Sequence, residues 1–469
     1  MTILFILPLF GAIVQLFTSS KRWALAISIL TFMESIRLYL AFDNNYADFQ
    51  YLISFNWFYK DIVFGIDGIS IYFILLTTLL FPICILASWN SIKYLNRQYL
   101  VSLLVIEWLL IGVFTVLDIL GFYIFYEGVL IPMFFIIGVW GARQQKITAA
   151  YYFFFYTLLG SVLMLISIMY IYSITGTTDY ITLRGYEMNA NIQKLIFLGF
   201  VASLAVKIPS FPFHIWLPQA HVEAPVAGSV LLAGVLIKLG SYGIIRYNLA
   251  LTPIACEYFS PLIITLSILG VIYASLTTIR QTDLKRIIAY SSVGHMGIVT
   301  IGIFTLNIVG LKGSIFLQLA HGLVSSALFI VVTMIYERYH TRIVKYYRGL
   351  TITMPIYSIY FLIFTLGNIA LPGTSNFVGE ILAIIGAVEI NLVVAILASS
   401  GIILSAAYSL FLYNRVAFGG LSSYMLVAPR DLNRREFYLL LPLAVLSIVI
   451  GIYPDEILKT IEPSLYLLI

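Results

Sequence analysis

Cysteine is almost absent from this sequence. Only Cys84 and Cys256 occur among its 469 residues. An iron-sulfur cluster takes most of its ligands from cysteine thiolates, usually four of them, so two thiols cannot hold one. The same count excludes a framework of several disulfides. We therefore expect no redox cluster on this chain.

Charged residues are scarce as well. Asp, Glu, Lys and Arg make up 10% of the sequence, whereas 61% of it is hydrophobic. The mean hydropathy is +1.01. No polar stretch is long enough for a soluble catalytic domain, so the composition predicts a polytopic membrane protein surrounded by lipids. Basic loops that face a negative compartment account for the net charge of +5, and we expect no nucleic-acid partner.

The start of the chain lacks the charge pattern of a cleavable leader. Its first apolar run, MTILFILPLFGAIVQLF, has no basic residue ahead of it, and Lys21 and Arg22 follow it. A signal peptide has the opposite order. The run is therefore predicted to be an uncleaved first span.

Apolar runs long enough to cross a bilayer, roughly 20 residues each, recur along the whole chain. We predict an all-α fold of about fourteen transmembrane helices in a single membrane domain, residues 1–469. Residues 42–65 carry acidic and aromatic side chains and are predicted to lie at the membrane interface. The spans are predicted near residues 2–18, 23–41, 66–88, 97–117, 119–139, 147–173, 193–217, 225–247, 259–279, 285–305, 311–337, 352–386, 391–417 and 437–457.

The distribution of basic residues orients these spans. Seventeen of the 26 Lys and Arg residues fall in the odd-numbered connections, and seven, Arg246 among them, fall on the other side. Since basic loops stay on the cytoplasmic or matrix side, both termini are expected on the opposite side. The two basic residues left over, Lys207 and Lys238, lie inside predicted spans.

Two predicted spans contain helix breaks. The first break is the run KIPSFP from Lys207 to Pro212, and the second is LPGTSN from Leu371 to Asn376, five spans later. Transporters are often built from inverted repeats that each contain a broken helix. Because five is odd, the pattern predicts inverted five-helix repeats over residues 97–248 and 258–417. Residues 1–96 would then hold the first three spans and 418–469 the last.

A carboxylate and two lysines are predicted to be buried in the membrane. Glu127 lies in the apolar run FYIFYEGVLIP, Lys207 is the first residue of the first break, and Lys238 lies in the next predicted span. A charge at the centre of a bilayer costs roughly 2.5–3.5 kcal/mol on insertion scales, so each needs a partner. We predict that Glu127 pairs with Lys207. Pro209 and Pro212 lack backbone donors, which would leave nearby carbonyls as further acceptors for the ammonium.

Three more titratable groups follow inside later spans: His295, His321 and Glu380. Imidazoles titrate near neutrality and pass a proton through either nitrogen, and buried carboxylates and lysines can take and return one. The order of these groups predicts a proton relay that consists of Glu127, Lys207, Lys238, His295, His321 and Glu380.

Other interpretations of single residues stay open. An intramembrane histidine such as His295 can be a hydrogen-bonded packing residue. Residues that we do not place in the relay are His214, His221 and Glu223, expected in a solvated loop after the first break, His340, expected at the surface, and Glu107, which has no assigned role.

Five motifs carry a resemblance to a known family. They are KIPSFPFHIWLPQAHVEAPVAGSVLLAGVLIKLG, FYIFYEGVLIP, DLKRIIAYSSVGHMG, QLAHGLVSSALF and ALPGTSNFVGE. Together they resemble the antiporter-like subunits of respiratory NADH-ubiquinone oxidoreductase, complex I, and among these the chain 4 family. The resemblance implies a fourteen-helix antiporter-like fold in the mitochondrial inner membrane, with a bacterial plasma membrane as the less favoured location.

The resemblance also implies roles and partners. The chain would translocate protons, coupled to electron transfer from NADH to ubiquinone on other subunits, beside the neighbouring antiporter-like chains 2 and 5. It would hold no cofactor, because flavin, iron-sulfur clusters, NADH and ubiquinone would be bound elsewhere. A glutamate at Glu380 fits chain 4, where chains 2 and 5 are expected to carry lysine. By this resemblance Glu127 and Lys207 form the coupled ion pair, Lys238 is the central relay, His295 and His321 form the bridge, and Glu380 completes the path.

Two other functions are weighed against this one. A cation/proton antiporter subunit of the related multisubunit family would share the fold and the lysines. A membrane haem or quinone protein would use His295 and His321 as ligands, but it would not need two buried lysines and two buried glutamates.

Overall fold

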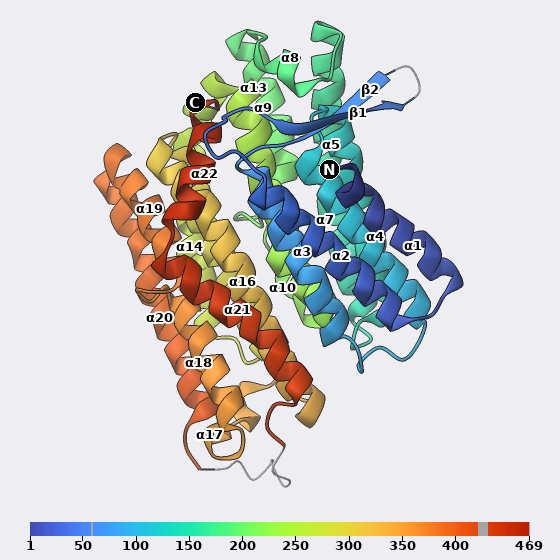
Figure 1. Cartoon of the computed structure of the whole chain (residues 1–469). Helices are drawn as coiled ribbons and strands as arrows, with labels where there is room; N and C mark the ends of the chain where they lie inside the picture. The colour runs from blue at the N-terminus through green and yellow to red at the C-terminus, as the bar shows by residue number, and fades with distance from the viewer. Residues whose placement is uncertain (58–59, 421–429, 469) are drawn as a thin grey trace.

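The computed structural model describes residues 1–57, 60–420 and 430–468, and these are almost entirely helical (Figure 1). Twelve described helices are long and apolar enough to cross a membrane, and Thr2–Phe17 and Pro355–Ile369 are two shorter apolar helices. Together they make up the fourteen predicted spans. The chain is therefore a multi-pass membrane protein, as predicted.

The helices follow the chain in three stretches. The first stretch contains α1 (Thr2–Phe17), α2 (Lys21–Leu40), α3 (Ser70–Ala87), α4 (Asn96–Thr115), α5 (Ile119–Gly128), α6 (Leu130–Trp140), α7 (Lys146–Thr175), α8 (Tyr180–Arg184) and α9 (Ala190–Lys207). The second contains α10 (Trp216–Glu223), α11 (Val226–Leu231), α12 (Ile237–Gly243), α13 (Leu249–Leu251), α14 (Pro253–Ile279), α15 (Leu284–Phe304) and α16 (Ile308–Tyr339). The third contains the 3-10 turn η3 (Val344–Tyr346), α17 (Leu350–Thr353), α18 (Pro355–Ile369), α19 (Ser375–Ile390), α20 (Leu392–Ala417), α21 (Arg434–Ile452) and α22 (Asp455–Tyr466).

The segment predicted to lie at the interface forms a β-hairpin. Strand β1 (Gln50–Trp57) pairs antiparallel with β2 (Lys60–Ile66), and Ile53 lies opposite Phe64. Both strands are rich in aromatic and β-branched residues, which pack well on a pleated surface. The hairpin projects from the same end of the bundle as both chain termini (Figure 1). It is the one sheet among the described residues, and it adds a small β element to the otherwise helical fold.

The centre of the bundle consists of two fully buried helices. In the continuous helix Val226–Leu251 and in helix α16, 100% of the residues in the 18-residue apolar stretch that could cross a membrane are buried. Within the first of them, the π-helical turns η1 (Leu232–Leu236) and η2 (Ile244–Asn248) lie on either side of α12, which carries Lys238. A π-helical turn locally widens the helix and is frequent at functional sites. The π-helical turns therefore indicate a functional site around Lys238.

Both predicted helix breaks are present. Helix α9 ends at Lys207 and α10 begins at Trp216, with Pro209 and Pro212 between them. Helix α18 ends at Ile369 and α19 begins at Ser375, and between them Gly373 has a φ of 92°, a conformation that glycine adopts without steric cost. The boundaries of the two inverted repeats stay a prediction.

The C-terminal helix α22 lies along the bundle rather than among the spans (Figure 1). Lys312 of α16 pairs with Glu462 of α22 at 2.9 Å. On α3, the hydroxyl of Tyr72 donates to Oγ1 of Thr460 at 3.1 Å. These contacts hold the last helix against both the N-terminal spans and the centre of the bundle.

Helices α16 and α19 approach each other closely through glycines. A Cβ added to Gly379 would lie 2.6 Å from Cα of Leu317, and one added to Gly313 would lie 2.4 Å from the backbone nitrogen of Ala383. Small residues let membrane helices come this close, because lipid supplies no hydrophobic force to press them together. The close approach holds α19, which carries Glu380, against the central helix α16.

We predict that Gly379→Ala separates α16 from α19. Backbone atoms of Leu317 occupy the position of the new methyl group, so helix axes must shift, and overpacking of this kind costs about 1–3 kcal/mol. Thermal unfolding of the purified protein measures the loss. Gly185→Ala is the matched control, since the nearest atom to its new Cβ is 3.7 Å away. Equal unfolding temperatures for the two variants would contradict the packing argument.

Candidate functional site

Glu127 and Lys207 lie near each other but do not form a direct ion pair. Lys207, the last residue of α9, is buried, and its Nζ donates to the backbone carbonyl of Tyr126 at 2.8 Å. The same Nζ lies 3.3 Å from the centroid of the Tyr126 ring. The charges of Glu127 and Lys207 interact electrostatically, while Oε1 of Glu127 has no hydrogen-bond partner among the described residues. Tyr126 thus supplies the contacts that we predicted for the carboxylate.

The helix breaks shape this first group of charges. Glu127 is the penultimate residue of α5, and α6 begins at Leu130, so the predicted fifth span is interrupted just beyond the carboxylate. At the break after α9, the carbonyl of Ala205 accepts the backbone N–H and the hydroxyl of Ser210, each at 3.0 Å. A carbonyl that we predicted to be left free for the ammonium by Pro209 is therefore satisfied by serine.

Lys238 is completely buried at the centre of the bundle, with 0% of its surface exposed. Its Nζ donates to the carbonyl of Ala233 in the preceding π-helical turn and lies 3.0 Å from Nδ1 of His321 on α16. One turn further, the hydroxyl of Ser241 donates to Oε1 of Gln318 at 2.6 Å. Two polar contacts thus join the central helix to α16 at this level.

His295 and Glu380 lie next to the contact between Lys238 and His321. The rings of His321 and His295 lie with their centroids 5.5 Å apart. Nδ1 of His295 lies 2.7 Å from Oε1 of Glu380, and its Nε2 lies 3.2 Å from Oδ1 of Asn368. Lys238, His321, His295 and Glu380 therefore form one contiguous row of side chains from four helices, although 85 residues separate His295 from Glu380 in sequence.

Two atoms of the row have no hydrogen-bond partner among the described residues. They are Nε2 of His321 and Oε2 of Glu380. Among the described residues, no direct contact joins Lys207 to Lys238. The structure thus brings the six predicted residues into two groups, Glu127 with Lys207 and the row from Lys238 to Glu380.

Several buried groups near the first break escaped the sequence prediction. His221 is fully buried, with its ring stacked 4.6 Å from that of Phe329, and Glu223 is 3% exposed, so the expectation of a solvated loop is wrong for both. Lys285, at the edge of the predicted span 285–305, is also buried and donates to the carbonyl of Ala224 at 3.0 Å. His221, Glu223 and Lys285 lie beside loops in the sequence, so the local pattern did not indicate their burial. They are enclosed only because α10 packs against α15 and α16. His340 is exposed, as expected.

A second missed feature is a buried ion pair between Asp67 and Arg246. The two side chains are 2.6 Å apart and 4–5% exposed. The guanidinium of Arg246 also lies over the rings of Phe49, Tyr180 and Tyr242, at 5.0, 5.7 and 5.4 Å. We counted Arg246 with the basic residues on the side opposite the odd-numbered connections, at the edge of the predicted span 225–247. In the structure it is part of the continuous central helix and joins that helix to the start of α3.

Glu107 is buried away from both groups. Its Oε1 accepts a hydrogen bond from the Thr31 hydroxyl at 2.5 Å, and its side chain faces the N-terminal helices. Oε2 of Glu107 has no hydrogen-bond partner in the part of the chain that the structure describes. No lysine, arginine or histidine among the described residues pairs with it, so its burial is compatible with a neutral carboxyl that packs α4 against α2.

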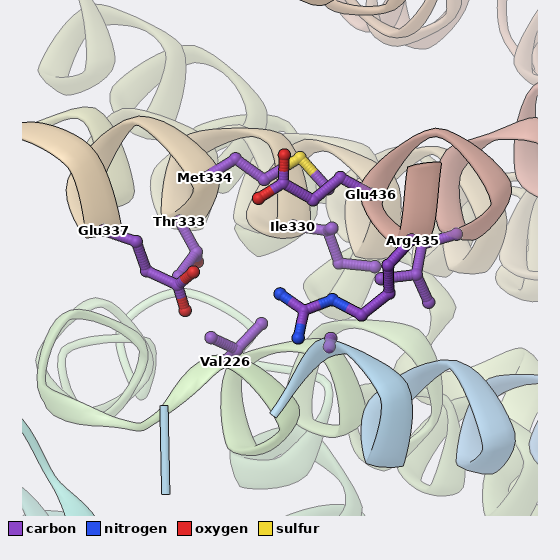
Figure 2. Close-up of a pocket in the computed structure, with 9 residues that line it drawn as sticks. Val226, Ile330, Thr333, Met334, Glu337, Arg435 and Glu436 are labelled. Carbon is purple, nitrogen blue, oxygen red and sulfur yellow. The ribbon is translucent and has the colours of Figure 1, made fainter. Parts of the chain in front are cut away.

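A small cavity between α16 and α21 holds none of the predicted site residues. The side chains of Glu337 and Arg435 point into it (Figure 2). Beside it, Arg338 pairs with Glu436 at 2.6 Å. This ion pair joins the ends of α16 and α21, and we interpret it as structural.

The arrangement of the His, Cys, Asp and Glu side chains does not favour binding of a metal ion or a haem. Within the described ranges, no group of three or more His, Cys, Asp and Glu side chains could hold a metal ion. Both ring nitrogens of His295 are already engaged, by Glu380 and Asn368. An imidazole whose two nitrogens are hydrogen-bonded is not available as a haem ligand. The haem interpretation is therefore disfavoured by the contacts of His295.

The fold and the buried row of titratable groups define a class. In the described part of the chain, fourteen apolar helices, two of which end at a break, surround lysines, histidines and glutamates that face one another. Buried ionisable residues that face the interior of a bundle typically mark ion pathways. The chain is thus an antiporter-like membrane protein.

Comparison with known proteins specifies the family. Residues 2–117 match the family described as NADH-ubiquinone oxidoreductase chain 4, amino terminus, and residues 116–405 match NADH:quinone oxidoreductase/Mrp antiporter, TM. NADH-ubiquinone oxidoreductase chain 4 of Metridium senile is 53% identical, covering 95% of this chain and 92% of that protein. The same protein of Chondrus crispus is 52% identical, covering 97% and 95%. The chain belongs to the NADH-ubiquinone oxidoreductase chain 4 family.

Solved structures agree with this assignment. A chain of respiratory complex I from Thermus thermophilus superposes with a TM-score of 0.91 at 28% identity, covering 99% of both chains. A chain of the Mrp complex from a Dietzia species superposes with a TM-score of 0.85 at 20% identity, covering 99% of this chain and 97% of that one. The second likeness shows the shared fold alone.

We predict that Arg246→Met destabilises the protein by about 3–5 kcal/mol, because it leaves the carboxylate of Asp67 buried without its partner. The double variant Asp67→Leu/Arg246→Met should be less destabilised, since no uncompensated charge remains. Denaturant unfolding in detergent measures both. Arg37→Met is the control: its pair with Glu34 is 63% exposed on the arginine side and should contribute at most about 1 kcal/mol. A double variant as unstable as Arg246→Met would contradict this account.

Proposed function

We propose that this chain is a core membrane-arm subunit of respiratory complex I that translocates protons, coupled to electron transfer from NADH to ubiquinone on other subunits. The observation that carries the proposal is the row Lys238, His321, His295 and Glu380, in which consecutive side chains lie within contact of one another at the centre of the bundle. Membership of the chain 4 family supports it.

The row suits stepwise proton transfer. Lys238 can release a proton to Nδ1 of His321, and an imidazole that gains a proton on one nitrogen can lose one from the other. The proton then reaches His295, which already faces the carboxylate of Glu380. Because the two rings are 5.5 Å apart between centroids, a water molecule or a ring rotation completes the transfer from His321 to His295.

Glu127 and Lys207 are proposed as the switch that starts a cycle. In this structure the ammonium is bonded to the carbonyl of Tyr126, and the nearby carboxylate is free at Oε1. A swing of Lys207 from the carbonyl to the carboxylate would exchange one set of contacts for the other. In surroundings of low dielectric, such an exchange changes the field at neighbouring lysines by a large amount. Lys207 could in this way favour or oppose a charge on Lys238.

The remaining expectations belong to the same proposal. The chain would lie in the mitochondrial inner membrane with both termini on the intermembrane-space side, next to chains 2 and 5 and to lipids. Flavin, iron-sulfur clusters, NADH and ubiquinone would bind to other subunits, with no nucleic-acid partner. Residues 97–248 and 258–417 would form the inverted repeats; the first contributes Glu127, Lys207 and Lys238, and the second contributes His295, His321 and Glu380.

A cation/proton antiporter subunit is the second candidate, favoured by the structural likeness to the Mrp complex. Purification of the chain with its native partners distinguishes the two functions. Flavin, iron-sulfur and quinone-reductase subunits in the purified assembly would support complex I, and their absence would support the antiporter.

We predict that Lys207→Ala and Glu127→Gln each lower proton-coupled NADH-quinone activity by about tenfold or more, the size expected for loss of a positioned proton-transfer group. The assembled complex, reconstituted in vesicles with a pH-sensitive dye, gives the measurement. Lys459→Ala is the control, because this lysine is 71% exposed on α22. Normal activity in an assembled Lys207→Ala complex would remove the switch from the mechanism.

A double-variant series tests whether the row acts as one path. Lys238→Met and His321→Gln each interrupt the contact between Nζ and Nδ1, so each alone should abolish most proton transfer through this subunit. The double variant should then be no worse than either single one. Losses that multiply in the double variant, measured as protons moved per NADH oxidised, would show that the two residues act independently.

A further inference from the structure

A hollow lies beside the C-terminal ends of α14 and α20, on the side of the molecule that carries the odd-numbered connections. It has a volume of about 480 Å³. Its walls come from the turn after α14, from η3 and from the last two turns of α20. The lining residues are Thr278, Ile279, Arg280, Gln281, Thr282, Ile287, Val344, Lys345, Tyr408, Phe411, Leu412 and Arg415.

Three cations line this hollow without a carboxylate. Arg280, Lys345 and Arg415 come from three different connections, and none of them forms an ion pair with a described residue. The acidic residue closest in sequence, Asp283, has other partners: its Oδ1 accepts the N–H of Lys285 at 2.9 Å, and its Oδ2 lies 4.0 Å from Arg143. The hollow therefore combines concave shape with uncompensated positive charge.

The other wall of the hollow is apolar. Ile287, Val344 and Leu412 are buried side chains that line it, and Phe411 is 63% exposed. The two packed helices whose ends line the hollow, α14 and α20, also carry exposed apolar side chains along their length. These are Tyr273, Leu276 and Ile279 on α14, and Ile403 and Leu410 on α20.

We propose that this hollow binds the phosphate group of an anionic phospholipid. The three cations contact the phosphodiester, and the acyl chains follow the apolar surface of α14 and α20. Charge complementarity selects this occupant over a zwitterionic lipid, whose own cation would meet three others. Clusters of Lys and Arg at the membrane face attract anionic lipids at about 1 kcal/mol for each residue.

The apolar wall distinguishes a lipid from a free phosphate ion. A phosphate ion would use the three cations but would leave Phe411 and the exposed side chains of α14 and α20 uncovered. An apolar helix of a partner subunit would cover those side chains but would bury three unpaired charges, which is costly. An anionic phospholipid neutralises the three cations and covers the apolar side chains. This inference does not depend on the proton relay.

The test uses the intact assembly in nanodiscs of phosphatidylcholine that contain increasing fractions of photoreactive phosphatidylglycerol. Crosslinked peptides from α14 and α20 are quantified by mass spectrometry. Crosslinking of the wild type should saturate at a low fraction of phosphatidylglycerol. The triple variant Arg280→Gln/Lys345→Gln/Arg415→Gln should raise the half-saturating fraction on the order of 100-fold.

A charge-matched control separates this site from general attraction. Lys93→Gln/Arg97→Gln/Arg434→Gln removes three exposed cations that lie in odd-numbered connections but do not line the hollow, and it should leave the half-saturating fraction unchanged. Equal shifts for the two triple variants would overturn the proposal. So would saturable crosslinking by photoreactive phosphatidylcholine, complete competition by millimolar inorganic phosphate, or crosslinks from these peptides to another protein subunit in place of lipid.

Discussion

The buried ammonium of Lys238 is the constraint on which the centre of this molecule depends. A cation with no exposure inside an apolar bundle must find acceptors at once, and it finds the carbonyl of Ala233 and the ring of His321. The carbonyl of Ala233 belongs to the π-helical turn that precedes α12, and His321 belongs to α16. The contacts that solvate this charge are thus the same contacts that we propose as a path for a proton.

Close packing extends these contacts to the second helix break. Because Gly379 has no Cβ, α19 lies against the backbone of α16 at Leu317, and the next residue, Glu380, reaches His295. The break before α19 lets this helix change direction after α18, which itself supplies Asn368 to the other side of the imidazole. Backbone geometry, rather than any single strong interaction, determines that carboxylate and imidazole meet.

The molecule treats its buried charges in two ways. Asp67 and Arg246 form a short, well-surrounded pair, and such a pair has little reason to exchange a proton. Glu127 and Lys207 are neighbours without a direct bond, and each has an alternative partner or a free atom. A tight pair stabilises one state, whereas a loose pair can adopt two. This contrast is why we place function in the loose pair and structure in the tight one.

The sequence by itself determined the membrane class, the fourteen spans, both breaks and the identity of the relay candidates, because hydropathy, proline and glycine act over one or two helical turns. It did not predict the hairpin, the burial of His221 or the pairing of Arg246 with Asp67. Only the tertiary structure decided that Lys207 bonds the carbonyl of Tyr126 and that Lys238 meets His321. These partners are 81 and 83 residues apart in the chain, and their contact depends on how whole helices pack, which no local pattern encodes.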